Sequence, residues 1–123
     1  MKIKTLELID ITLDWAVAKC KGENGVLHDD GITRCIVIAA ASGVYKGTWK
    51  PSVNWSQGGP IIEREGISTV QEGDAADWVA SVYDHKAYDW HLHTLGETPL
   101  IAAMRCYVAS KLGEEVEVPD ELA

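Results

Sequence analysis

The sequence predicts a single α+β domain, built from a small, mainly antiparallel or mixed sheet and two principal helices. Two segments, residues 10–21 and 99–112, have apolar patterns and end residues typical of helices. Segments 2–8 and 32–41 instead have the alternation or β-branched content of strands. A chain of 123 residues can bury enough apolar surface to fold without disulfides or metals. We expect one domain over residues 1–123 with an acidic tail over about 114–123.

The first forty residues predict a strand, a helix and a second strand. Residues 2–8 alternate polar and apolar side chains, which indicates a half-buried strand. Asp10 is expected to cap a helix that runs to about Lys21, and Gly22 to end it in a left-handed conformation. Residues 23–31 are expected to form a loop, followed by a buried strand over 32–41.

The middle of the chain has the least regular pattern. Residues 42–60 contain four glycines, two prolines and three large aromatic residues without periodicity, so we expect a long irregular loop, here called the aromatic Gly-Gly loop. Residues 61–65 are expected to form a strand with one polar face, and residues 74–82 a short helix that displays Trp78. Residues 84–93 support no assignment.

The C-terminal helix is the most clearly delimited element. Thr98 is expected to be its N-cap, Pro99 to occupy its first position and Gly113 to close it. Its broad apolar side and its side of small residues predict close packing across the sheet. Val116 and Val118 alternate with glutamates, which predicts a final short strand that ends at Pro119.

Charge and composition exclude several classes of protein. The formal net charge is -8, with 19 acidic and 11 basic residues, which argues against direct binding of DNA or RNA. No apolar run has the length of a membrane span, and no secretory signal is expected, so the chain is expected in a cytoplasm without membrane attachment. Cys20, Cys35 and Cys106 lack paired spacing, which predicts reduced cysteines, with Cys106 beside Arg105 as the only mild nucleophile candidate.

The aromatic Gly-Gly loop contains the best candidate ligand site. Flat rings offer stacking surfaces, amides can read the edge of a ring, and glycine backbone amides can meet an anion closely. The candidate ligand-binding residues are therefore Tyr45, Trp49, Asn54, Trp55, Gln57, Gly58, Gly59 and Arg64. The alternative is that this loop covers the core and its tryptophan rings pack against the sheet. Since the chain contains no Phe, Trp and Tyr must also serve as core residues.

Three charged residues are candidates for acid–base chemistry or for ion pairing. On the expected strand, Glu63 and Glu65 share one face, where two carboxylates can perform acid–base or metal chemistry. Arg105 lies on a largely apolar helix, where an unpaired guanidinium is costly. We therefore expect Arg105 to pair with Glu63 or Glu65, and structural pairing is favoured over recognition of an anion.

A group of histidines invites a metal interpretation that the spacing does not support. His85, His91 and His93 lie near Asp84 and Asp89, and two histidines of a strand at i and i+2 point the same way. The same segment also has the alternating pattern of an ordinary amphipathic strand. No established metal, nucleotide or hydrolase motif is present in the sequence. We predict no metal site and no cofactor.

Three strings, LDWAVAKC, WSQGGPIIERE and GETPLIAAMRCYVASKLGEEVEVPDEL, carry a resemblance. Together they resemble the NinX-like family of small accessory proteins of lambdoid phages and prophages, from about Leu13 to Leu122. The resemblance implies a phage or prophage protein that acts in the cytoplasm of the bacterial host and is dispensable for basic growth. It supplies no catalytic residue to carry over.

The preferred function is that of a non-enzymatic binder. Its ligand is expected to be a small, planar or nucleotide-like anion, held by the aromatic Gly-Gly loop, or else a host protein. One alternative is a small hydrolase of a nucleotide or signalling molecule, with Glu63, Glu65 and the histidines as acid–base or metal groups. Another is a protein-binding inhibitor of a host enzyme. A homodimer is also expected.

Overall fold

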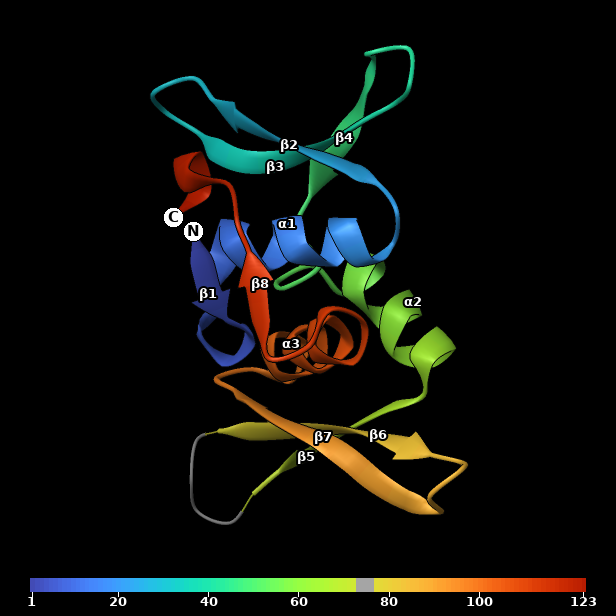
Figure 1. Ribbon diagram of the computed structural model, residues 1–123. Helices are drawn as coiled ribbons and strands as arrows, with labels where there is room; N and C mark the ends of the chain where they lie inside the picture. The colour runs from blue at the N-terminus through green and yellow to red at the C-terminus, as the bar shows by residue number, and fades with distance from the viewer. Residues whose placement is uncertain (73–76) are drawn as a thin grey trace.

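The computed structural model describes residues 1–72 and 77–123, which form an α+β fold with three α-helices (Figure 1). The helices are α1 (Asp10–Cys20), α2 (Trp55–Glu65) and α3 (Pro99–Leu112). Two short 3-10 helices, η1 (Thr5–Glu7) and η2 (Asp120–Leu122), lie near the two ends of the chain. None of the helices in these described residues is long and apolar enough to cross a membrane.

The strands of the described residues form three antiparallel sheets. A two-stranded sheet pairs β1 (Lys2–Lys4) with β8 (Glu115–Glu117). The second sheet has the order β2 (Asn24–Asp29), β3 (Arg34–Ala39), β4 (Tyr45–Trp49). The third has the order β5 (Ile67–Gln71), β6 (Trp78–Asp84), β7 (Asp89–Gly96). The expected small sheet is thus divided into three, and the antiparallel pairing is confirmed.

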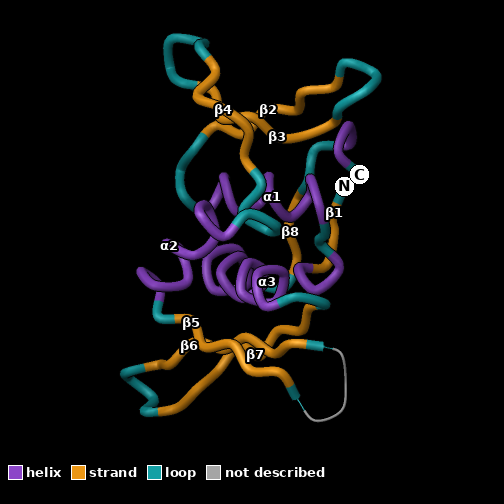
Figure 2. The backbone as a smooth tube through the Cα atoms, turned by 180° about the vertical axis from the view of Figure 1, so that it is seen from behind, coloured by secondary structure: helices purple, strands orange, loops and turns teal. Residues whose placement is uncertain are grey.

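The helices lie between the two three-stranded sheets. Both views place α1 against the β2–β3–β4 sheet and α3 against the β5–β6–β7 sheet, with α2 at the side of the two helices (Figures 1 and 2). The core runs through this helical layer, and the α3 residues Ala102, Ala103 and Met104 have no exposed surface. Small side chains on α3 let the neighbouring backbones approach, so α3 becomes the centre of the fold.

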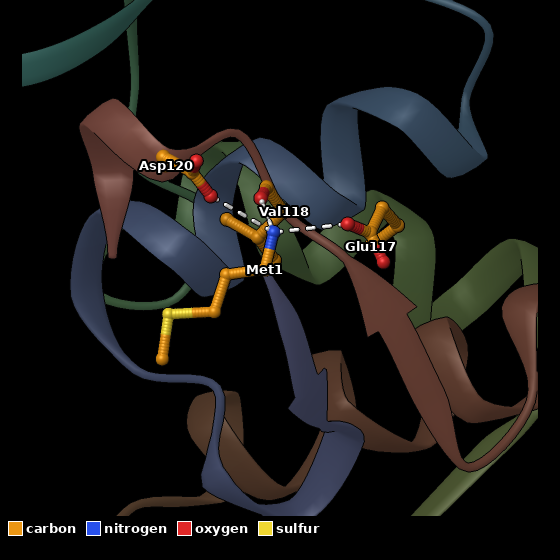
Figure 3. Close-up of polar contacts among 4 residues, drawn as sticks. All are labelled: Met1, Glu117, Val118 and Asp120. Atoms are coloured by element: carbon orange, nitrogen blue, oxygen red, sulfur yellow. Dashed lines mark hydrogen bonds and ion pairs between the residues drawn. The ribbon is translucent and has the colours of Figure 1, made fainter.

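The two ends of the chain meet beside this core. The Met1 amine donates hydrogen bonds to the Glu117 Oε1 at 2.9 Å, the Val118 carbonyl at 2.8 Å and the Asp120 Oδ1 at 3.0 Å (Figure 3). These side-chain hydrogen bonds raise the pKa of the amine. Val118 is itself buried, so the contact ties the first strand to the core through the last one.

Several sequence-based expectations are confirmed. The Thr98 side chain accepts from the Ile101 amide at 3.1 Å, Pro99 is the first helical residue of α3, and Gly113 follows its last residue. Gly22 has the left-handed φ of 74° that a helix terminator needs. The strand expected over 32–41 is present as β3, and the final short strand is present as β8.

Two details near the N-terminus differ from expectation. The first strand covers only Lys2–Lys4, because the chain turns into η1. The Asp10 side chain is not the cap of α1. Instead, the Thr12 hydroxyl accepts from the Ile9 amide at 3.1 Å and donates to the Ile9 carbonyl at 2.7 Å.

The aromatic Gly-Gly loop, residues 42–60, is the main correction. It contains strand β4 and the first half of helix α2, which also includes residues 61–65, expected to be a strand. Asn54 caps α2, since its Oδ1 accepts from the Ser56 amide at 2.9 Å, and Gly66 ends it with a φ of 65°. Glycine has poor helix propensity, and the glycines of this segment interrupt the apolar periodicity that would predict a helix. The sequence of this helix therefore resembles that of a loop.

Two further segments were also assigned wrongly. Residues 24–29, expected to lie in a loop, form β2, because their backbone pairs with β3 along its whole length. Trp78 begins strand β6 and is not part of a short helix; residues 74–76 of that expected helix lie outside the described residues. The unassigned segment that follows forms most of β7.

Candidate functional site

Trp49, expected to stack on a ligand, is a core residue. Its side chain is 8% exposed, and its indole Nε1 donates to the backbone carbonyl of Asp14 at 3.0 Å. The Lys21 ammonium lies 5.0 Å from the centre of the ring. The alternative interpretation, in which tryptophan fills the core beneath the sheet, is therefore right for Trp49.

The side-chain amides of Asn54 and Gln57, expected to read the edge of a ligand, are already hydrogen-bonded to other groups of the chain. The Asn54 Oδ1 accepts from the amide and the hydroxyl of Ser56, at 2.9 and 2.6 Å. The Gln57 Oε1 accepts from the Lys50 amide at 2.6 Å, and its Nε2 donates to the Thr48 carbonyl at 2.8 Å. These bonds join β4 to α2, so the two side chains shape the connection between the elements.

The glycines and Arg64 do not form an anion cradle. The Gly58 amide donates to the Asn54 carbonyl at 2.9 Å as part of the helix, and Gly59 follows it in the same turn. A Cβ on Gly58 would lie 2.5 Å from the Pro51 carbonyl oxygen and 2.6 Å from Leu100, whereas one on Gly59 would make an ordinary contact with the Trp55 ring at 3.9 Å. Gly58 therefore serves close packing, and Arg64 lies in the last turn, 3.7 Å from the Glu65 carboxylate.

Trp55 and Tyr45 remain exposed, at 56% and 59%. Trp55 is the first residue of α2 and lines a hollow of about 160 Å³ together with Ser52, Val53 and residues 98–100. Tyr45 begins β4, about 13 Å along the strand from Trp49 at the usual rise per residue. Of these two exposed aromatics, Trp55 lies at the edge of a concave surface, and the largely buried Trp49 lines a separate hollow of about 250 Å³ with Gln57.

A larger cavity of about 380 Å³ lies on the other side of the same connection. We call it the Asp14–Ser52 pocket, after the two buried side chains at its wall. Its lining comes from three elements: α1, β3 and the β4–α2 connection. The lining residues are Asp10, Ile11, Asp14, Arg34, Cys35, Lys50, Ser52 and Val53. Ser52 and Val53 line both hollows, so the two hollows flank this part of the connection.

Asp14 is a buried carboxylate, 4% exposed, on the helix that packs beneath the sheet. Its Oδ1 accepts from the Ser52 backbone amide at 3.0 Å. Burial raises the pKa of the Asp14 carboxyl to about 6, while hydrogen bonding from Ser52 opposes the rise. A carboxyl that titrates near neutral pH in a cavity is a feature typical of functional sites.

The Ser52 hydroxyl is the least satisfied polar group of the pocket. Ser52 is 2% exposed, and its Oγ meets no hydrogen-bond partner among the described residues. The side chain lies near enough to Asp14 to lower its pKa, without reaching hydrogen-bonding geometry. A buried hydroxyl without a partner costs free energy.

Charged side chains surround this pair. Lys50 and Arg34 line the pocket, and Lys50 acts to lower the pKa of Asp14 while Asp10 acts to raise it. The Arg34 guanidinium also contacts residues outside the pocket lining. Its Nη2 donates to the Glu121 carbonyl at 2.7 Å, and its Nε lies 3.6 Å from the Asp29 carboxylate. Asp10 has a φ of 51°, a left-handed conformation that costs free energy and recurs at functional sites.

Sequence analysis missed this pocket, although one signal was present. Asp14 is a charged residue within a helix that is apolar around most of its circumference, which is the argument that singled out Arg105. Arg34, Lys50 and Ser52 give no such signal, because only the folded chain brings β3 and the β4–α2 connection to α1.

Arg105 does not pair as expected. Its Nε donates to the Leu8 carbonyl at 2.9 Å and its Nη1 to the Leu95 carbonyl at 2.8 Å. Burial lowers the pKa of the guanidinium, and Glu97 and Asp77 act in the opposite direction. Glu65 instead lies 3.1 Å from the Lys111 ammonium, while Glu63 is exposed on α2. Because α2 is a helix, Glu63 and Glu65 do not share the face that a strand would give them.

The remaining candidates show no assembled chemistry. Within residues 1–72 and 77–123, no three His, Cys, Asp or Glu side chains gather as metal ligands, and the side chain of His91 lies outside the description. The His93 Nδ1 lies 3.2 Å from the Ser81 Oγ. Burial raises the pKa of the Cys106 thiol to about 11, which argues against a nucleophile.

A family model described as bacteriophage P22 NinX matches residues 4–111. The chain belongs to this family. The match spans α1, all of β2 to β7 and nearly all of α3, so it includes every residue of the Asp14–Ser52 pocket. It also confirms the resemblance that the three strings carry, and it identifies a phage accessory protein. No curated protein matches the chain.

Proposed function

We propose that this phage accessory protein binds, without transforming it, a small ligand with an anionic group in the Asp14–Ser52 pocket, in the cytoplasm of the bacterial host. The observation that carries the proposal is the cavity itself, whose lining brings the cations of Lys50 and Arg34 to the buried Asp14 and Ser52. Two cationic side chains suit an anion that accepts hydrogen bonds.

The pocket and the neighbouring hollow together suit a ligand with two parts. Lys50 and Arg34 would contact the anionic group, in place of the glycines and Arg64. A planar part that extends over Val53 would reach the exposed face of Trp55, since Val53 lines both hollows. Trp55 thus keeps the stacking role expected from the sequence, whereas Trp49 does not.

Binding is favoured over hydrolysis by what the acid–base candidates contact. Glu65 is ion-paired with Lys111, and Arg105 is held by two backbone carbonyls. The thiols of Cys20 and Cys106 both have pKa values raised to about 11 by burial. These groups serve packing and pairing in the fold.

Native mass spectrometry of protein purified gently from infected host cells tests the proposal. A reproducible added mass of small-molecule size is expected with the wild type and is expected to be lost with Lys50→Gln. Lys46→Gln is the matched control, because Lys46 is an exposed lysine of β4 that lies 3.8 Å from Glu23, outside the pocket. A bare chain, or an added mass that Lys50→Gln retains, would overturn the assignment of the site.

A further inference from the structure

The four charged side chains of the Asp14–Ser52 pocket are balanced in sign. Asp10 and Asp14 are four residues apart on α1, so they lie one turn apart on the same side of that helix. Arg34 comes from β3, where its Nε also lies 3.6 Å from the Asp29 carboxylate, and Lys50 comes from the β4–α2 connection. The cavity therefore has carboxylates from the helix and cations from the sheet side.

This arrangement discriminates against ligands of a single charge. A simple anion near Lys50 and Arg34 also faces two carboxylates, and a simple cation near Asp10 and Asp14 also faces two cations. Opposite charges attract and like charges repel, most strongly at the buried Asp14 and less at Asp10, Arg34 and Lys50, which are exposed. A molecule with a cationic and an anionic group a few ångströms apart satisfies both walls.

Ser52 lies at the acidic wall of this cavity. Its backbone amide donates to the Asp14 carboxylate at 3.0 Å, and Ser52 is buried. The cavity has a volume of about 380 Å³. That volume lies in the usual range for small-molecule sites.

We infer that the ligand is a zwitterion of the α-amino acid class, with its ammonium at Asp10 and Asp14 and its carboxylate at Lys50 and Arg34. The inference rests on the proposed function and specifies its ligand. The side chain of the amino acid extends over Val53, which lines both hollows, toward Trp55.

Calorimetric titration with three matched sets of probes tests this inference. The probes are leucine, phenylalanine and tyrosine as free amino acids, as N-acetyl derivatives that keep only the anion, and as carboxamides that keep only the cation. The free amino acid is expected to bind about tenfold or more tightly than either derivative, as the loss of a charged hydrogen bond implies. Amide chemical shifts of the pocket residues locate the binding.

Variants of opposite charge make the test specific. Lys50→Gln and Asp10→Asn are each expected to weaken binding of the free amino acid by about tenfold, and Lys46→Gln is expected to leave its affinity unchanged. Asn tolerates the left-handed conformation of Asp10, so this variant keeps the local backbone. Equal binding of the free amino acid and its N-acetyl derivative would overturn the zwitterion and leave the anion-binding proposal standing.

The remaining outcomes separate the two proposals. Inorganic phosphate and adenosine monophosphate are titrated in parallel as probes without an α-amino group. If these bind at the pocket while no amino acid does, the zwitterion is wrong and the proposed function holds. If no probe of any set shifts the amides of the pocket, and the natively purified protein carries no small molecule, both are wrong.

Discussion

The Asp14 carboxylate accepts a hydrogen bond from the Ser52 backbone amide at 3.0 Å, across 38 positions of sequence. The backbone carbonyl of the same aspartate accepts from the Trp49 indole, also at 3.0 Å. One residue of α1 therefore holds both the end of β4 and the connection to α2. These two hydrogen bonds to Asp14 determine where the wall of the pocket lies.

The raised pKa of Asp14 predicts a specific pH dependence of stability. Because the folded pKa is about 6 and the ordinary value is 3.8, the folded state binds this proton more tightly than the unfolded state. The resulting stabilisation is fully present below pH 3.8 and is lost as pH rises through about 6. Asp14→Asn, whose amide oxygen still accepts from Ser52, removes this dependence.

Urea unfolding at a series of pH values measures the effect. Between pH 4 and pH 7.5, the free energy of unfolding of Asp14→Asn relative to the wild type is expected to rise by up to about 3 kcal/mol. Glu63→Gln, which changes an exposed carboxylate of α2 outside the pocket, serves as the control. Parallel pH profiles of the wild type and Asp14→Asn would contradict the assignment.

Trp49 and Trp55 should differ in what their removal costs. Trp49→Ala leaves a cavity in the core and removes the hydrogen bond from the indole to the Asp14 carbonyl, so it is expected to lower the free energy of unfolding by about 3–5 kcal/mol. Trp55→Ala is expected to cost less than about 1 kcal/mol of stability, because the ring is largely exposed. If the proposed ligand stacks on it, Trp55→Ala weakens binding by about 1–3 kcal/mol. Chemical denaturation and ligand titration separate the two, and equal losses of stability would refute the distinction.

The adjacent glycines of α2 provide a matched pair. At Gly58, a Cβ would meet the Pro51 carbonyl oxygen at 2.5 Å, so Gly58→Ala is expected to destabilise the protein by about 1–3 kcal/mol. At Gly59, the nearest atom outside the adjoining residues is 3.9 Å away, but a Cβ there would crowd the ring of Pro60, which disfavours helical backbone in the residue before it. The gain in helix propensity is therefore offset, and Gly59→Ala is expected to change stability by less than about 1 kcal/mol. Thermal unfolding compares the two variants, and a loss for Gly58→Ala no larger than that for Gly59→Ala would argue against this packing of α2.

Arg105 is expected to matter for stability through its two carbonyl partners. Arg105→Met keeps most of the apolar stem but leaves the Leu8 and Leu95 carbonyls without their donor, at a cost of about 1–3 kcal/mol. Arg64→Met, which changes an exposed arginine of α2, is expected to change stability by less than about 0.5 kcal/mol. Denaturant titration compares them, and a neutral Arg105→Met would show that water replaces the guanidinium.

The sequence by itself determined the elements whose local signals agree. The α3 helix has Thr98, Pro99 and Gly113 at its ends and apolar residues between them, and β3 has an unbroken β-branched run. In these segments capping, propensity and periodicity indicate the same structure, so no distant contact is needed to choose it. The family strings and the α+β class follow from the same local information.

Only the tertiary structure decided the form of α2 and the place of the pocket. Gly58, Gly59 and Pro60 lower helix propensity, yet this helix exists because Asn54 caps it and Gly58 fits against Pro51 and Leu100. The pocket joins Asp14 to Ser52 and Arg34, which are far apart in sequence. Propensity acts over a few neighbouring residues, whereas these contacts depend on how α1, β3 and the β4–α2 connection pack, and packing outweighs a local preference of about 1 kcal/mol.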